Sequence, residues 1–326
     1  MNASGEKALE YVNRFKDTES LAIAKMLFRD FPEIYRNIDT ARSAVRYRRG
    51  ANGKENRMKQ KLKKPQTPPP RVPKSDAEPW LPYELPKDCK RWLVIADWHW
   101  PFHDVQACKI ILTHAKDSGC DSVLMLGDMC DCHELSRWEK SPLERKFRDE
   151  ITLAKEALQG IKEYLKPKRF VWKAGNHEER FCHYLFRHAP ALFGIEDFEW
   201  ENIFKLEKLG VEWITDQRPV TCGRLFLIHG HEFARNMMSP VNPARGVFLR
   251  AHECAVVAHS HTPSSHSEST FAERMISCWS IGCGCDLHPR YCRHNRWAHG
   301  YGILDVEKDN WQFRNFKIVK QKVRAA

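Results

Sequence analysis

No run of apolar residues in this 326-residue chain approaches the length that a transmembrane helix needs, which is about 20 residues. The opening residues, MNASGEKALE, lack the apolar centre of a secretory signal peptide. A repeat of the solenoid type is missing as well. We therefore expect a protein that has no membrane partner and remains in the cytoplasm.

Acidic residues are almost missing from residues 42–74. This segment holds twelve lysines and arginines against a single acid, Glu55. Its surplus of +11 equals the net charge of the whole chain, so the remaining sequence is neutral. A basic block of this kind favours binding to a polyanion, above all nucleic acid. A solvated linker whose charge only aids solubility is the alternative interpretation.

Disulfide bonds are not expected, although the chain contains 12 cysteines. A disulfide framework is typical of short secreted chains. Here Cys120, Cys130, Cys132 and Cys254 lie within or beside apolar runs. We therefore expect reduced thiols, as in a cytoplasm.

The length favours one large domain with a small appendage. Residues 1–50 are predicted to form a small all-α unit, because apolar residues recur in it at helical spacing. Three helices are expected: one over residues 8–15, a second capped by Asp17 or Thr18 and ended before Pro32, and a third over residues 41–49 capped by Asp39 or Thr40.

The third predicted helix is rich in arginine. Arg42, Arg46 and Arg49 share one face at positions i, i+4 and i+7, and Arg48 lies beside them. Three short helices that end in such a helix resemble a helix-turn-helix unit, so these four arginines are candidate DNA-binding residues. A bundle that docks on another protein is the alternative.

Residues 51–88 are predicted to be a linker. They combine a lysine-rich run with the proline-rich stretch PQTPPPRVPKSDAEPW, which cannot build a core. The main domain is expected over residues 89–326. Its first part alternates strands with helices and its second part is rich in strands, a pattern that predicts an α/β domain with sheets packed between helices.

Five apolar segments of the main domain run into residues of metal-binding type. Each segment is typical of a buried strand. The residues at their ends comprise two carboxylates, one amide and four imidazoles: Asp97, His99, Asp128, Asn176, His229, His259 and His261. Sites in open α/β sheets form at the carboxyl ends of strands. We therefore expect these seven side chains to meet at one edge.

The expected donor set suits two metal ions better than one. Seven mixed nitrogen and oxygen donors are too many for one tetrahedral zinc ion. They suit two divalent cations about 3.5–4 Å apart that are bridged by one carboxylate. The two aspartates only partly neutralise two such ions, and the residual positive charge favours a phosphate and acidifies a bridging water. This arithmetic indicates phosphoester hydrolysis.

The order of these motifs resembles one known family. The chain matches, in order, the five motifs of calcineurin-like metallophosphoesterases: Asp97-x-His99, Gly127-Asp128-x-x-Asp131, Gly175-Asn176-His177-Glu178, His229-Gly230 and Ala258-His259-x-His261. The layout also resembles bacteriophage and bacterial members with a small helical unit ahead of the catalytic domain. The resemblance implies a four-layer sandwich of two mixed β-sheets flanked by helices, and a bacterial or phage-infected host cell.

The resemblance implies a role for each ligand. The first metal ion would be held by Asp97, His99 and His261. The second would be held by Asn176, His229 and His259, and both would be bridged by Asp128. Mn²⁺ is expected first, with Fe²⁺, Zn²⁺ or Ni²⁺ as alternatives.

Catalytic roles are implied for two further motif residues. His177 would donate a proton to the leaving oxygen and Asp131 would orient it, with a metal-bridging hydroxide as the nucleophile. His231 and His103 are candidate substrate-binding residues. The second motif often continues with arginine in Ser/Thr protein phosphatases, but Cys132 follows here, which makes a phosphoprotein substrate less favoured.

Two neighbouring groups of residues are expected near the site. The aromatic residues Trp98, Trp100 and Phe102 either line a substrate cleft or pack in the core. Cys283-Gly-Cys285 lacks the paired spacing of a structural zinc site, and its glycines indicate a loop near the centre.

Three functions are compatible with these features. The first is a phosphodiesterase or nuclease brought to nucleic acid by the basic N-terminal segment. The second is a phosphatase or cyclic phosphodiesterase for small molecules or phosphoproteins, with the basic arm serving only for localisation. The third is a DNA-binding protein whose esterase site is silent, and the intact ligand set argues against it.

Overall fold

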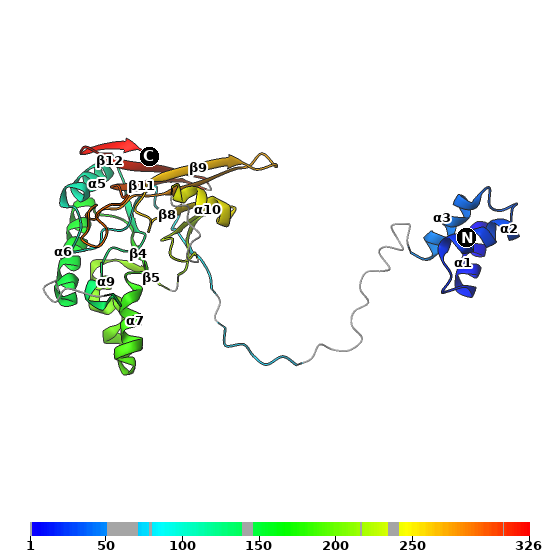
Figure 1. Cartoon of the computed structure of the whole chain (residues 1–326), viewed down its shortest axis with the longest axis horizontal. Coiled ribbons are helices and arrows are strands. Elements are labelled where there is room, and N and C mark those ends of the chain that lie inside the picture. Colours follow the sequence, from blue (N-terminus) through cyan, green and yellow to red (C-terminus); the bar gives the residue numbers. More distant parts are fainter. Residues whose placement is uncertain are drawn as a thin grey trace. The chain divides into compact units, whose positions relative to one another are not determined.

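The computed structural model of the chain describes residues 2–50, 71–77, 80–138, 146–215, 217–233, 241–308 and 310–326. Two compact units divide the chain, Met1–Glu78 and Pro79–Ala326 (Figure 1). The lysine-rich half of the expected linker, residues 51–70, lies outside the described residues.

The N-terminal unit is helical, as predicted. Its helices are α1 (Ala3–Arg14), α2 (Ser20–Asp30) and α3 (Ile38–Arg48). They pack around a shared core that includes Ile23, Leu27, Tyr35 and Val45. This small core is separate from those of the main unit.

The starts of α2 and α3 differ from the prediction. Helix α2 begins after Glu19, whose side chain makes no capping hydrogen bond, so neither Asp17 nor Thr18 is the cap. Helix α3 begins after Asn37, whose side chain accepts a hydrogen bond from the Thr40 N–H at 2.9 Å. The Thr40 hydroxyl in turn accepts from the Asn37 N–H at 3.2 Å. This capping box places Thr40 inside the helix and lengthens it at its start.

The main unit is built on two mixed sheets. Among the described residues, the strand orders are β13-β12-β11-β2-β3-β4-β5 and β1-β6-β7-β8-β10-β9. The strands are β1 Tyr83–Glu84, β2 Arg91–Ile95, β3 Ser122–Met125, β4 Phe170–Lys173, β5 Glu212–Ile214, β6 Val220–Cys222, β7 Leu225–Ile228, β8 Cys254–Val257, β9 Ser264–Ser269, β10 Met275–Ser280, β11 Gly300–Glu307, β12 Asn310–Val319 and β13 Lys322–Ala325.

Alternating side chains explain the unbroken apolar run of β2. Trp92 and Val94 pack into the core between the two sheets. Leu93 and Ile95 pack into the core between this sheet and its helices. A strand that is buried on both faces needs apolar residues at every position.

Helices complete four layers. On the seven-stranded sheet lie α5 to α9, and α10 packs on β8, β9 and β10 of the other sheet (Figure 1). The helices are α5 Val105–Asp117, η1 His133–Leu135, α6 Phe147–Leu165, α7 Glu179–His188, η2 Pro190–Leu192, η3 Glu196–Phe198, α8 Trp200–Phe204, α9 Leu206–Leu209 and α10 Pro243–Ala251. No helix among the described residues is long and apolar enough to cross a membrane.

Parallel pairing gathers the predicted site. Strands β2, β3 and β4 are parallel neighbours, as are β7 and β8 in the other sheet. The chain leaves each of these strands just before a predicted ligand. Their carboxyl ends therefore carry all five motifs to one edge of the sandwich.

Some elements differ from the prediction. The predicted linker over residues 51–88 includes Tyr83–Glu84. These two residues form β1 and pair with β6, so the predicted linker extends too far toward the C-terminus. Strand β9 has the sequence SSHSES, which shows no apolar alternation from which a strand could be predicted. It lies at the edge of its sheet, pairs with β10, and leaves most of its side chains exposed.

Candidate metal centre

Backbone strain marks the ends of the motif strands. Five of the seven predicted ligands adopt left-handed conformations with φ between 47° and 62°: Asp97, His99, Asp128, His259 and His261. Residues other than glycine seldom adopt this conformation. Such strain concentrates at functional sites, where the surrounding structure holds it.

The first ligand group contains Asp97, His99 and His261. The Nε2 atom of His261 lies 3.2 Å from Oδ1 of Asp97 and 3.2 Å from Nε2 of His99. Among the described residues, the buried Asp97 Oδ1 has no hydrogen-bond donor, which is costly for a carboxylate oxygen. A cation shared by this oxygen and the two ring nitrogens would remove that cost.

The second group contains Asp128, Asn176, His229 and His259. The Nε2 atom of His229 lies 3.2 Å from Oδ2 of Asp128 and 3.2 Å from Oδ1 of Asn176. The other ring nitrogen of His229 donates to the Leu126 carbonyl at 2.9 Å, which leaves Nε2 as the ligand atom. One ligand atom of His259 lies within 4.8 Å of those of Asp128 and His229.

Asp128 connects the two groups. Its carboxylate clusters with His229 and His259 and also with His99 and His177. The side chain is almost fully buried, as a bridging carboxylate would be. Oxygen and imidazole donors suit Mn²⁺, Fe²⁺, Zn²⁺ and Ni²⁺. The residues therefore fit a pair of divalent cations, and the donor set leaves the choice of metal open.

The electrostatics keep both aspartates ionised. Burial would raise the pKa of Asp97, but the charge of His261 holds it below its ordinary value. Burial would likewise raise the pKa of Asp128, and His177 and His229 hold it well below the usual range. Burial would lower the pKa of His229, yet Asp128 raises it to about 10. Ionised carboxylates are the form that binds cations.

His177 and Asp131 lie beside these groups. The Nδ1–H of His177 donates to the Asp131 carbonyl at 2.8 Å and lies 3.3 Å from the carboxylate Oδ1. That Oδ1 also lies 3.0 Å from Nδ1 of His99. Burial would raise the pKa of Asp131, but its hydrogen bonds with His177 and His99 hold it far below its ordinary value. An ionised Asp131 thus orients a predicted ligand and the predicted proton donor together.

Arg180 was not predicted from the sequence. Its guanidinium donates to Nε2 of His177 at 2.8 Å and to the Asp131 carbonyl at 2.7 Å. The available signal was its position three residues after His177, at the start of the following helix α7. Arg180 supplies a cation at the centre, although Cys132 occupies the position where many phosphatases have arginine.

Two glutamates, the buried Glu178 and the partly buried Glu232, hold the ligand loops in a role that was not predicted. Glu178 accepts hydrogen bonds at 2.8–3.1 Å from the backbone N–H groups of Asp128, Met129, Cys130 and Gly175. Glu232 accepts from the N–H groups of His229 and Gly230 and pairs with the buried Lys173 at 2.6 Å. The available signal was the position of each acid: Glu178 is the last residue of the third motif, and Glu232 follows His229 by three residues.

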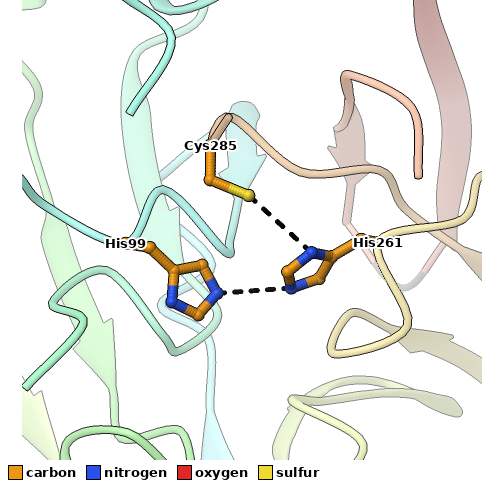
Figure 2. Close-up of side chains that lie close together, drawn as sticks. All are labelled: His99, His261 and Cys285. Carbon is orange, nitrogen blue, oxygen red and sulfur yellow. Dashed lines mark hydrogen bonds between the residues drawn. The ribbon is translucent and has the colours of Figure 1, made fainter. Parts of the chain in front are cut away.

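The cysteine loop lies at the centre, as expected. Sγ of Cys285 lies 3.7 Å from Nδ1 of His261, while Nε2 of the same ring faces His99 (Figure 2). Cys285 therefore contacts the ring nitrogen that is turned away from the ligand group. Gly284 is required here, because an added Cβ would lie 2.3 Å from the Trp98 ring.

The aromatic residues and the two histidines that were predicted near the substrate differ in their positions. Trp98 and Trp100 are buried in the core, whereas Phe102 is 41% exposed and lines a cavity. His231 lies 3.0 Å from Glu179 through Nε2. His103 forms an isolated backbone bridge with Cys285. The described residues that line this cavity include neither histidine, and their substrate-binding role stays a prediction.

The four predicted DNA-binding arginines differ in their surroundings. Arg48 donates to the Gly5 carbonyl at 2.9 Å, and Arg49 donates to the Phe15 carbonyl at 3.2 Å and to Thr18. These two arginines connect the helices of the N-terminal unit. Arg42 and Arg46 are exposed. A DNA contact stays a prediction, and Arg42 and Arg46 are its better candidates.

Comparisons with known proteins agree with the motifs. The sequence model of the calcineurin-like phosphoesterase family matches residues 90–305. The gene 54 proteins of Mycobacterium phages L5 and D29 are 25% and 27% identical over 232 residues, which cover 67% of this chain and 89% of each relative. YfcE, a phosphoesterase from E. coli, shares 16% identity with a TM-score of 0.35, covering 72% of this chain and 98% of that one.

The family match spans every predicted ligand, from Asp97 to His261. It also covers the strands whose ends carry those ligands. The four-layer arrangement of two mixed sheets and helices is the fold that the resemblance implies. The chain therefore belongs to the calcineurin-like phosphoesterase family of dimetal hydrolases, which act on phosphoester bonds.

Proposed function

We propose that this hydrolase is a phosphodiesterase or nuclease that acts on nucleic acid. The observation that carries the proposal is the joining of two ligand groups through Asp128, with Arg180 fixed beside them. A fixed cation next to a two-metal donor set favours an anionic phosphodiester. The surplus of +11 within residues 42–74 favours a polyanion as the larger substrate.

The chemistry divides between the metals and the protein. When bound, two divalent cations, Mn²⁺ in the first instance, would neutralise phosphate charge and acidify the attacking water. The protein's part is to hold and deliver a proton. Asp131 fixes His177 through Nδ1, so Nε2 is the atom that serves the leaving oxygen. Arg180, which contacts this Nε2, would turn to the phosphate oxygens and leave Nε2 to the leaving group.

The N-terminal unit would bring the enzyme to its substrate. Arg42 and Arg46 share the exposed face of α3, four residues apart. Contacts from such arginines to phosphates are independent of base sequence and weaken steeply with salt. We place this activity in the cytoplasm of a bacterial or phage-infected cell.

A substrate panel tests the proposal. The full chain loaded with Mn²⁺ is incubated with bis(p-nitrophenyl) phosphate, single- and double-stranded DNA, RNA, mononucleotides and a phosphopeptide. We expect cleavage of the diester and of at least one nucleic acid. Turnover of monoesters alone would overturn the proposal in favour of a phosphatase.

Duplex binding tests the role of the N-terminal unit. The double variant Arg42→Gln/Arg46→Gln should bind DNA more weakly and with a smaller salt dependence than the unchanged chain. The matched control is Lys16→Gln/Lys25→Gln, which removes the same charge from exposed positions of the same unit. Equal losses in the two double variants would show that only net charge matters.

A further inference from the structure

A cavity of about 330 Å³ opens beside the metal centre. Its lining includes the predicted ligand His99 and Asp131, which orients His177, so the cavity is continuous with the centre. The opposite wall comes from residues 286–297, which follow the cysteine loop. No motif of the metal centre accounts for this wall.

The segment over residues 286–297 is fixed at both ends to the centre. At its start, the Asp286 N–H donates to the Phe102 carbonyl at 2.8 Å. At its end, the Ala298 N–H donates to the carbonyl of the ligand His261 at 2.9 Å. Inside it, the Asn295 amide donates to the carbonyls of Leu287 and Cys292. The wall is therefore a built part of the site whose distance from the metal ligands is set by hydrogen bonds.

Aromatic rings are the first chemical feature of this cavity. Phe102 is 41% exposed and Tyr291 is 74% exposed, although large apolar rings are normally buried. Trp297 is half-buried, and its ring centroid lies 4.1 Å from that of His261 and 6.2 Å from that of Tyr291. Exposed rings at the mouth of a polar site form a surface on which a planar group can stack.

Charged side chains are the second feature. Arg290 and Arg293 line the same cavity, and Asp286 contributes a carboxylate. The arginines can contact phosphate oxygens or stack on a base. Together, Asp286 and the arginines offer an acceptor and donors for the polar edge of a base. A purely apolar ligand would contact only the aromatic rings of this cavity, and a purely anionic ligand would contact only its arginines.

We infer that this cavity binds the base of a nucleotide whose phosphate lies at the metal centre. The inference rests on the proposed function, since it names the substrate class of that same site. Base stacking on an aromatic side chain strengthens binding roughly 5- to 150-fold. Tyr291 and Trp297 would therefore select nucleotides over phosphates that carry a sugar alone.

Binding measurements test this selection without relying on turnover. The Mn²⁺-loaded full chain is titrated calorimetrically with thymidine 5′-monophosphate and with 2-deoxyribose 5-phosphate, which differ only by the base. We expect the nucleotide to bind about tenfold more tightly. Tyr291→Ala and Trp297→Ala should each reduce this ratio toward one. The control Tyr164→Ala, at an exposed ring that stacks with Lys116 on the helical side, should preserve it.

Two further ligands define the occupant. A short 5′-phosphorylated oligothymidylate that binds more tightly than the mononucleotide indicates that the cavity receives the end of a nucleic acid, and equal binding indicates a free nucleotide. Phenyl phosphate that binds as tightly as the nucleotide would overturn the inference, because any aromatic ester would then suffice. Equal affinity for thymidine 5′-monophosphate and 2-deoxyribose 5-phosphate would overturn the inference too. So would an affinity ratio between these two ligands that is unchanged in both Tyr291→Ala and Trp297→Ala. A failure of the proposed phosphodiesterase or nuclease function would be seen in a different experiment, the substrate panel, as the absence of diester hydrolysis.

Discussion

The guanidinium of Arg180 lies 2.8 Å from Nε2 of His177, the ring atom that we assign to proton transfer. The same guanidinium donates to the carbonyl of Asp131, which also holds the opposite side of the His177 ring. The guanidinium thus places a cation beside the ring atom of His177 that faces the centre. It also supplies a ready partner for an incoming phosphate.

Replacing Arg180 should therefore lower catalysis. We expect Arg180→Met to reduce kcat/KM for bis(p-nitrophenyl) phosphate by roughly 10- to 100-fold, the range for losing a hydrogen bond to a charged group. Arg180→Lys should recover part of this loss, because it keeps the charge without the fork of donors. The control is Arg187→Met, which removes an exposed arginine from the same helix. Equal kinetics in the Arg180→Met and Arg187→Met variants would contradict the role of Arg180.

The role of His177 can be tested by varying the leaving group. His177→Ala should slow hydrolysis by about 100- to 10,000-fold where the leaving oxygen needs a proton, as in thymidylyl-thymidine. The loss should be much smaller for thymidine 5′-p-nitrophenyl phosphate, since p-nitrophenolate leaves readily without a proton. His183→Ala, on the exposed face of α7, is the control. If both substrates lose activity by the same factor, His177 is not the proton donor.

Because Asp128 lies between the two ligand groups, we expect its substitution to change how many metal ions the chain binds. Asp128→Asn removes the charge shared by both ligand groups, so we expect the purified chain to hold fewer than two Mn²⁺ per molecule at saturation. Elemental analysis after dialysis measures this ratio directly. Asp149→Asn alters an exposed carboxylate in the first turn of α6 and should leave the ratio unchanged. Two ions retained in Asp128→Asn would place the bridge on another residue.

The ends of the buried strands were predictable from the sequence for a simple reason. A strand covered on both faces must be apolar throughout, so the first polar residues after it stand out. Asp97 and Asp128 follow such runs, and parallel pairing then brings them together. The candidate ligands could therefore be named without any knowledge of long-range contacts.

Contacts between loops were not predictable in this way. Arg180 and its partner Asp131 are 49 residues apart, and no local pattern sets the distance between them. The wall over residues 286–297 is fixed by hydrogen bonds to Phe102, which follows the first motif, and to His261, which ends the fifth. Its aromatic residues resemble ordinary loop residues until the fold places them beside the centre.

Glu150 supports the catalytic loop from outside the metal centre and gives a prediction for stability. Its carboxyl group is buried on α6 and accepts a hydrogen bond from the Cys132 N–H at 2.6 Å. Burial raises its pKa from 4.5 to about 8. The folded chain thus retains a proton that the unfolded chain loses once the pH exceeds 4.5. Between these two values Glu150 makes folding less favourable as the pH rises, by about 1.4 kcal/mol per pH unit.

Glu150→Gln should remove this slope, because the amide keeps an acceptor for the Cys132 N–H and does not ionise. We expect the free energy of unfolding of the variant, relative to the unchanged chain, to rise from pH 5 to pH 8 and then level off. Urea unfolding of both proteins across this range, without added metal, measures the difference. Glu156→Gln, an exposed glutamate on the same helix, controls for the loss of charge alone. A difference that does not vary with pH would show that Glu150 titrates near its ordinary value and that its burial is relieved by the hydrogen bonds of the loop.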